Sequence, residues 1–288
     1  MNRYLDLTSS YKFLSEHEKE LDDLMQNSDG ALYDGTDLVV FVDDEAKEYT
    51  VKEGTRRILD GAFLEKKKLE KITLPNTLEV IGCRAFKRCG IHEINMPASI
   101  KAIQNEAFMN CKLLKKLEIH ESVLVWGTTV FAGCDELETV SLPNDMYHIP
   151  DWTFYCNHKL KKVKFPSNLL SIGNYAFGAC FALEGIDLPR RVSSVGIAAF
   201  FSCRNIKKIV FPSSLKKIDG RCFQHCESLS EIVIPKRISF IGIQAFDACP
   251  NLKKVYIKNF GLADKNLTVA LTSSSQYYSN GIINNINR

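Results

Sequence analysis

The sequence predicts a solenoid of stacked repeats in the α/β class, with short parallel strands on one side and short helical or 3₁₀ turns on the other. The same apolar and small residues recur around a regularly spaced aromatic residue. Self-similarity at a period of roughly 20 to 50 residues is typical of arrays in which each unit buries the apolar face of the next. Nine phenylalanines mark the period at steps of 23 residues, with one step of 22: Phe63, Phe86, Phe108, Phe131, Phe154, Phe177, Phe200, Phe223 and Phe246.

Each repeat contains a strand, and in most repeats this strand ends at a proline. Apolar residues alternate across a polar one, as in Val163 and Phe165, and this alternation is typical of a strand with one buried face. Proline then follows, as at Pro166, and ends the strand because it lacks an N–H. An Ile or Val stands five residues before the Phe, and a glycine often follows it at a corner. The segment Ala-Phe-x-x-Cys predicts a short helical turn, and the strands together predict one parallel sheet.

Composition and charge restrict the partners of this chain. Its 288 residues are 45% apolar and 25% charged, which is usual for a globular domain. The net charge of +3, from 37 basic and 34 acidic residues, favours neither nucleic acid nor an acidic membrane surface. No apolar run approaches the roughly 18 residues of a membrane span, so no membrane insertion is expected. The first residues lack the apolar segment of a signal peptide, so the sequence alone predicts a cytoplasmic protein.

Most of the ten cysteines follow the repeat. A cysteine that returns at the same repeat position is expected to be a buried small side chain, and a disulfide framework would not follow the period. Cys222, His225 and Cys226 are the tightest group of soft metal ligands, but the repeat positions of the two cysteines favour burial over zinc. We therefore expect no metal and no cofactor. Seven cysteines stand three residues after a repeat Phe: Cys89, Cys111, Cys134, Cys180, Cys203, Cys226 and Cys249.

The repeat resembles the BspA-like class of leucine-rich repeats, also called the Treponema pallidum type. The segment Leu160–Cys180 fits the pattern L-x-x-I-x-L-P-x-x-L-x-x-I-G-x-x-A-F-x-x-C at nearly every position, and the resemblance covers about residues 46–258. It implies a right-handed leucine-rich repeat solenoid with a concave parallel sheet and convex turns. It also implies surface proteins that adhere to host proteins or to other cells. Localisation is therefore open between the cytoplasm and the cell surface.

The period divides the chain into three parts. Residues 1–45 predict an N-terminal cap, made of a helix at 12–27 and a strand at 38–42. Residues 46–258 form the leucine-rich repeat solenoid of about nine 23-residue repeats, and residues 259–288 predict a C-terminal cap or tail. Caps are expected because a terminal repeat would otherwise expose its core. By the same argument, truncating Phe177 should cost more stability than truncating Phe63, because Phe177 lies between two coils. The chain is also expected to be monomeric.

The fourth and fifth repeats depart from the pattern. Neutral drift in a tolerant array and a specialised surface both account for such departures. Asp151 and Trp152, with Tyr147 and His148 nearby, form an aromatic and titratable group that is a candidate contact for a glycan or a peptide. The departures are Trp126 at an Ile position, Pro150 at a Gly position and Asn157 at a Cys position.

The polar positions beside the buried ones are expected to line the concave face. From the third repeat on they alternate between basic and acidic, and opposite charges on adjacent strands stabilise each other. One interpretation is a self-neutralising surface, and the other is a charged groove for an extended protein partner. An apolar stripe beside the charges is typical of an interaction site. The candidate partner-binding residues are Lys161, Lys162, Lys164, Lys207, Lys208, Val210, Val233, Lys253, Lys254 and Tyr256.

These observations favour a non-enzymatic protein–protein interaction module. The resemblance implies an adhesive role, with binding to a host or other protein through the concave face. An intracellular scaffold or regulator that uses the same face is the alternative. A glycan-binding protein or an enzyme built on residues around 120–158 is a second alternative, although the chain has no Gly-rich phosphate loop, no G-x-S-x-G and no H-E-x-x-H motif.

Overall fold

The structure, a computed structural model, describes residues 29–257, and for residues 254–257 it describes the backbone alone. The chain divides into two compact units, Met1–Asp135 and Glu136–Arg288, and each is described by itself. The expected helix at 12–27 and the expected cap at 259–288 lie outside the described residues. The division into cap, solenoid and cap therefore stays a prediction.

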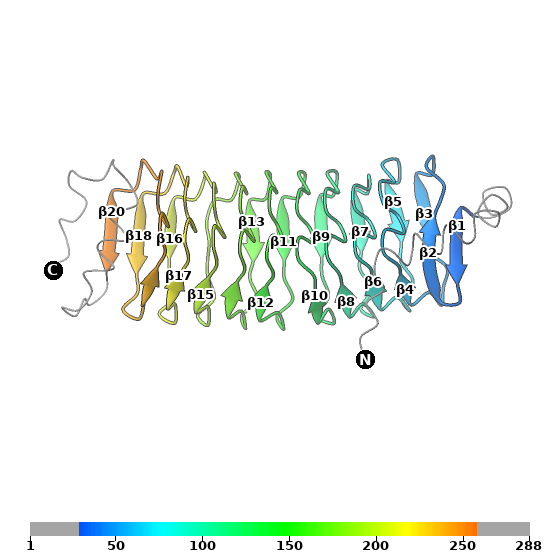
Figure 1. Cartoon of the computed structure of the whole chain (residues 1–288), viewed down its shortest axis with the longest axis horizontal. Coiled ribbons are helices and arrows are strands. Elements are labelled where there is room, and N and C mark those ends of the chain that lie inside the picture. The colour runs from blue at the N-terminus through cyan, green and yellow to red at the C-terminus, as the bar shows by residue number, and fades with distance from the viewer. Residues whose placement is uncertain (1–28, 258–288) are drawn as a thin grey trace. The chain divides into compact units, whose positions relative to one another are not determined.

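The first unit is a stack of coils, each with two short parallel strands, that begins with an antiparallel hairpin (Figure 1). The hairpin consists of β1 (Ala31–Asp34) and β2 (Asp37–Phe41). A first ladder collects β3 (Glu48–Thr50), β5 (Lys71–Thr73), β7 (Glu93–Asn95) and β9 (Lys116–Glu118), of which β5 and β7 precede a proline. A second ladder continues from β2 through β4 (Arg57–Ile58), β6 (Val80–Ile81), β8 (Ala102–Ile103) and β10 (Val125–Trp126).

The second unit repeats this plan with an interrupted first ladder. Its second ladder is continuous and contains β12 (His148–Ile149), β14 (Ser171–Ile172), β15 (Ser194–Val195), β17 (Lys217–Ile218) and β19 (Phe240–Ile241). Its first ladder contains β11 (Thr139–Ser141) with β13 (Lys162–Lys164), and then β16 (Lys208–Val210), β18 (Glu231–Ile234) and β20 (Lys254–Ile257). Between β13 and β16 only a single bridge from Ile186 to Ile209 forms, because Gly185 weakens the strand.

The strands pair at equivalent repeat positions, as the period predicts. In β5, for example, Ile72 is buried between exposed Lys71 and Thr73, and Ile72 lies opposite Tyr49 of β3. Parallel strands with one buried face are therefore confirmed. The expectation of one sheet was incomplete, because the Ile position before each Phe also pairs with its neighbours, as Ile58 does with Ile81. Each coil thus contributes to two ladders.

The repeat phenylalanines stack into an internal column within each unit. In the first unit, the ring centroids of Phe63, Phe86, Phe108 and Phe131 follow one another at 5.0, 5.1 and 5.3 Å. In the second, Phe154, Phe177, Phe200, Phe223 and Phe246 follow at 5.4, 5.4, 5.3 and 5.5 Å. All nine side chains are buried. The offset-stacked geometry is favourable for aromatic rings, so these columns form the centre of the core.

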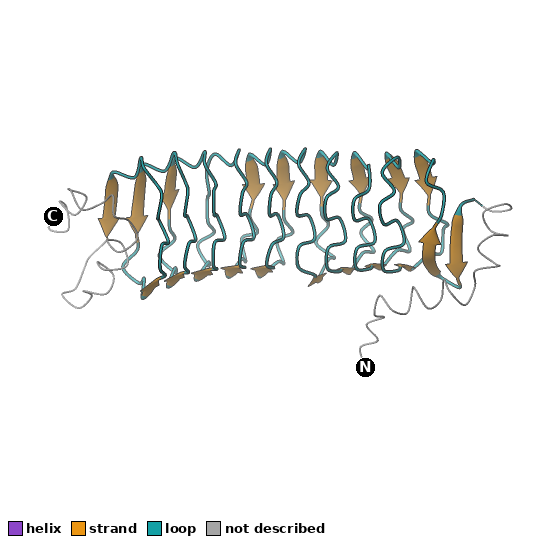
Figure 2. Cartoon of the chain, turned by 45° about the horizontal axis from the view of Figure 1, so that its top comes forward, coloured by secondary structure: helices purple, strands orange, loops and turns teal. Residues whose placement is uncertain are grey.

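The segments around each Phe form a wall of turns, and the predicted helical or 3₁₀ turns are wrong. The described residues contain strands and loops without a helix, so the α/β class is wrong for this part of the chain (Figure 2). The reason is the left-handed backbone two residues before and after the Phe, as at Arg84 (φ 58°) and Arg88 (φ 61°). A right-handed helix cannot pass through such residues. Their N–H groups instead donate to the next coil, from Arg84 to Asn105 at 2.9 Å and from Arg88 to Met109 at 2.9 Å.

The hairpin end of the first unit also differs from the expectation for a terminal repeat. Phe63 is fully buried, because the ring of Phe41 lies 5.1 Å away and the ring of Tyr49 lies 5.9 Å away. The column therefore extends into the segment before the first repeat Phe. The expected difference between truncating Phe63 and truncating Phe177 therefore loses its structural basis, since both rings are covered on two sides.

The cysteines of the repeat are buried, as predicted, and their thiols make a regular contact. Each thiol donates to the carbonyl oxygen of the Phe in the preceding coil, at 2.8 Å from Cys89 to Phe63 and at 3.2 Å from Cys203 to Phe177. Burial raises the pKa of Cys89 to about 12, so the thiol stays protonated and neutral at physiological pH. Cysteine at this position therefore acts as a small core residue with one donor.

Candidate functional site

The outward-facing residues on the first-ladder strands and next to them are here called the ladder face, and the predicted partner-binding residues lie on these strands or directly before them. In the second unit Val210 is 57% exposed and lies opposite Val233, which is half-buried. The backbone of Val233 in turn pairs with that of Tyr256. The register therefore places these three residues on one line across neighbouring strands, while the side chains of Tyr256 and Lys254 lie outside the described residues.

Two of the predicted lysines are neutralised by the neighbouring coil. Lys161 Nζ lies 3.0 Å from a carboxylate oxygen of Glu138, and Lys208 Nζ lies 3.0 Å from one of Glu231. Both pairs join equivalent positions of successive coils. Exposed pairs of this kind contribute at most about 1 kcal/mol each. At these two positions the ladder face is self-neutralising, which was one of the two interpretations of the sequence.

The other predicted lysines whose side chains the structure describes have no ion-pair partner between residues 29 and 257. Lys162, Lys164 and Lys207 are exposed, and none of them forms an ion pair with any residue from 29 to 257. Lys253 is likewise exposed and without an ion pair in this part of the chain. Between the groups of Lys162 and Lys207 the coil carries the exposed Gly185, where a Cβ would meet nothing within 4 Å. The face therefore presents two basic groups on either side of a coil that carries the exposed Glu184 and Asp187 around Gly185.

The ladder face of the first unit contains a hollow that sequence reasoning missed. It has a volume of about 440 Å³. Three carboxylates and three ammonium groups surround it, so its charge is balanced. One coil here is a residue short, since the step from Phe86 to Phe108 is 22 residues, and this step was the available signal. The lining residues are Glu48, Glu70, Lys71, His92, Glu93, Lys115 and Lys116.

The candidate contact in the fourth and fifth repeats does not form one site, because each of its polar or aromatic groups joins a neighbouring coil. His148 Nδ1 lies 2.8 Å from the Ser171 hydroxyl. Asp151 accepts hydrogen bonds from the backbone N–H and the side-chain amide of Asn174, at 2.7 and 3.0 Å. The ring of Trp152 stacks on that of Tyr175 at 4.0 Å and 6°. These contacts hold coils together, while Tyr147, at 52%, and His148 stay exposed.

The candidate ligands Cys222, His225 and Cys226 do not form one site either, because the cysteines and the histidine lie in different surroundings. Both cysteines are fully buried, whereas His225 lies on the wall of turns with its ring edge-on to Phe201 at 5.5 Å. Among residues 29–257 no cluster of three or more His, Cys, Asp or Glu side chains is placed to hold a metal ion. In the same part of the chain no helix has the length and apolar character of a membrane span.

Comparison with known proteins identifies the repeat. A family model described as the BspA type leucine rich repeat region matches residues 39–161 and 149–265. A leucine rich cell surface protein from Faecalibacterium prausnitzii A2-165 is 22% identical with a TM-score of 0.59, over 80% of this chain and 77% of that chain. A leucine-rich repeat protein from Bacteroides ovatus ATCC 8483 is 21% identical with a TM-score of 0.50, over 78% and 85%. The comparison with curated proteins gave no match.

Proposed function

We propose, from the premise that this chain belongs to the BspA-type leucine-rich repeat family, that it is a non-enzymatic module that binds an extended protein partner through the ladder face of its second unit. The observation that carries the proposal is the lack of an ion-pair partner, within residues 29–257, for Lys162, Lys164 and Lys207 beside the exposed Val210. An exposed apolar residue with a charged rim is the usual composition of a protein-binding surface.

The geometry also favours a class of partner. Successive strands of a ladder lie roughly 5 Å apart, so a segment that crosses them meets one polar position per coil. Lys162 and Lys164 would attract acidic side chains, Gly185 would let the segment approach the backbone, and Val210 with Val233 would contact an apolar side chain. We therefore expect an acidic segment with an apolar residue near one end. Charge complementarity of this kind mainly raises the association rate and sets the register.

Adhesion at a cell surface is the form of this proposal that we would test first. The fold is shared with a protein described as a cell surface protein, and the repeat family implies the same context. An intracellular scaffold that uses the same lysines is the alternative. Fractionation of the native cells separates the two, because protein confined to the cytosol would refute adhesion.

A photo-crosslinking residue at position 210 would test the surface itself. Crosslinked partners are captured from intact cells and compared with those obtained from a crosslinker at Ile243, which is 77% exposed but lies outside the first ladder. The captured partner is then titrated, as a purified protein, against the double variant Lys162→Glu/Lys164→Glu. We expect its affinity to fall by about tenfold or more, with a steep dependence on salt.

A matched double variant controls for net charge. Lys216→Glu/Lys236→Glu changes the charge by the same amount at exposed positions outside the first ladder. The proposal predicts near-normal binding by this variant. Equal losses in the two double variants, or capture of the partner from position 243 alone, would show that the ladder face is not the binding surface.

A further inference from the structure

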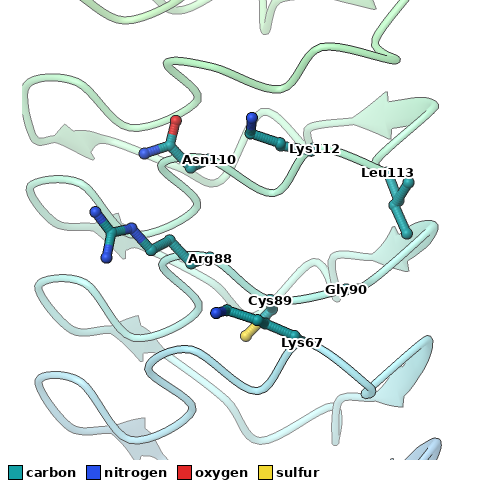
Figure 3. Close-up of a pocket in the computed structure, with 7 residues that line it drawn as sticks. All are labelled: Lys67, Arg88, Cys89, Gly90, Asn110, Lys112 and Leu113. Atoms are coloured by element: carbon teal, nitrogen blue, oxygen red, sulfur yellow. The ribbon is translucent and has the colours of Figure 1, made fainter.

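A second hollow in the first unit lies where the coils run from the wall of turns towards the strands of the first ladder. It has a volume of about 540 Å³. Three successive coils contribute one cationic side chain each, together with an amide and an apolar residue (Figure 3). The residues that line it are Lys67, Arg88, Cys89, Gly90, Asn110, Lys112 and Leu113.

The hollow exists because the coil at Gly90 is one residue short. Apolar residues usually stand six positions after the repeat Phe, but Ile91 stands only five after Phe86. The shortened chain turns in against the preceding coil, where the Gly90 N–H donates to the Lys66 carbonyl at 3.1 Å. A Cβ at Gly90 would overlap the carbonyl oxygen of Lys67, so only glycine fits. The wall is therefore indented at a position that other coils fill with a side chain.

The side chains around the hollow leave a net positive charge. Arg88 is held by Glu65 at 2.6 Å, and Lys112 lies 3.7 Å from Asp135. Lys67 forms no ion pair with any residue from 29 to 257. Three cations thus face two carboxylates, and neither carboxylate lines the hollow.

Lys67 is the exception among its neighbours. Lys66 lies 2.5 Å from Asp44, and Lys68 lies 2.5 Å from Glu45. Figure 3 shows the Lys67 amine and the Arg88 guanidinium directed to the same side of the hollow, and the Asn110 amide nitrogen lies on that side as well. Ammonium, guanidinium and amide groups together are donors that suit an oxyanion.

We propose that this hollow binds a tetrahedral oxyanion carried on a sugar-sized polar body, that is, a sugar phosphate or a sulfated sugar. Lys67 and Arg88 contact the oxyanion, and Asn110 bonds a hydroxyl group. The volume is many times the share of about 30 Å³ that one water molecule takes, so an inorganic ion alone would leave it largely unfilled. The half-exposed Leu113 provides the contact for the sugar ring.

No carboxylate from residues 29–257 lines the hollow, and the oxyanion shares the Arg88 guanidinium with Glu65, which lies 2.6 Å from it. Cys89 is the one titratable lining group that could become anionic, but its thiol donates to the Phe63 carbonyl at 2.8 Å and stays neutral. The site therefore binds rather than reacts. It belongs to the first unit and the proposed protein-binding face belongs to the second, so the two proposals rest on different residues.

Calorimetric titration of the full chain with glucose 6-phosphate and glucose 6-sulfate tests the proposal, with glucose and inorganic phosphate as comparison ligands. We expect one or both esters to bind, the preferred ester to identify the anion, and glucose to show no binding. Lys67→Gln and Arg88→Gln should each weaken the ester by about tenfold or more, since each removes a charge-assisted hydrogen bond.

Lys68→Gln is the matched control, because it removes the same charge next to Lys67 but outside the hollow. Its affinity should stay within about twofold of the unmodified protein, and thermal melting should show that all three variants fold. The proposal is overturned if neither ester binds, if the control weakens binding as much as Lys67→Gln, or if inorganic phosphate binds as tightly as glucose 6-phosphate.

Discussion

Truncation of one ring in the second Phe column measures how much the stack contributes to stability. In Phe177→Ala the lost ring has Phe154 and Phe200 as stacked neighbours, each with centroids 5.4 Å away, and Phe165 edge-on at 5.6 Å. The side chain is fully buried. The change therefore removes two stacking contacts and leaves a cavity in the middle of the column.

The expected cost follows from those contacts and from the stiffness of the coils. Phe to Ala in a core costs about 3–5 kcal/mol, depending on how far the site collapses. Collapse is opposed here, because the N–H of Phe154 donates to Ala176 at 2.8 Å and the N–H of Phe177 donates to Ala199 at 2.8 Å. Backbone bonds on both sides thus hold the coil spacing. We expect a loss of about 4 kcal/mol.

Urea unfolding followed by circular dichroism provides the measurement. With an m-value of about 2–3 kcal/mol/M, the midpoint should fall by roughly 1.3–2 M. Phe201→Ala is the control, because Phe201 is the half-exposed next residue outside the column, and it should cost less than about 1.5 kcal/mol. Phe63→Ala should cost as much as Phe177→Ala. A loss at Phe177 no larger than the loss at Phe201 would refute the stacked core.

Two further changes follow from the cysteine column and from the glycines. Burial raises the pKa of the Cys203 and Cys226 thiols. Above the ordinary thiol pKa of about 8.5, the unfolded chain therefore loses protons that the folded chain keeps. The free energy of unfolding should then fall as pH rises, by about 1.4 kcal/mol per pH unit for each thiol. Urea midpoints from pH 8 to 10 should therefore fall less steeply in Cys203→Ala/Cys226→Ala, and an unchanged slope would contradict the assignment. Gly90→Ala should lower the free energy of unfolding by more than about 2 kcal/mol, because its Cβ would overlap the backbone. Gly185→Ala has open space around its Cβ and should change stability by less than about 1 kcal/mol in either direction. Thermal melting compares the two variants, and equal shifts would contradict the overlap at Gly90.

The core was predictable from sequence, because burial and stacking depend only on the period. Any side chain that returns every 23 residues must meet its own copy in the next coil, and this fixes the Phe columns and the buried thiols. The turn conformation was not predictable in the same way. Ala-Phe-x-x-Cys is compatible with a helix, and the left-handed positions carry ordinary residues such as Arg84 and Arg88 in place of glycine. Bonds to the next coil offset their strain, and one repeat read alone does not reveal them.

The candidate surfaces were predictable only in outline. Strand alternation identified the outward positions, including Lys162 and Lys164. Which lysine is left without an ion pair depends on the side-chain conformations, since Lys161 forms an ion pair with Glu138 while Lys162 does not. Both hollows lie along the coil with the 22-residue step. The sequence shows that this coil is one residue short, but it does not show how the backbone accommodates the missing residue. An irregular step in an otherwise strict period is therefore a useful place to look for a ligand.

The hydrogen bonds between coils have an evolutionary consequence. The N–H of Phe177 meets the carbonyl of Ala199, and that of Phe200 meets the carbonyl of Cys222, so each coil offers its successor the same edge that it accepts from its predecessor. Excision or duplication of a whole 23-residue block would rejoin matching edges. The array can thus lengthen or shorten by whole coils while its core contacts stay the same. The loss of a single residue instead shortens one coil and leaves a hollow such as the one at Gly90.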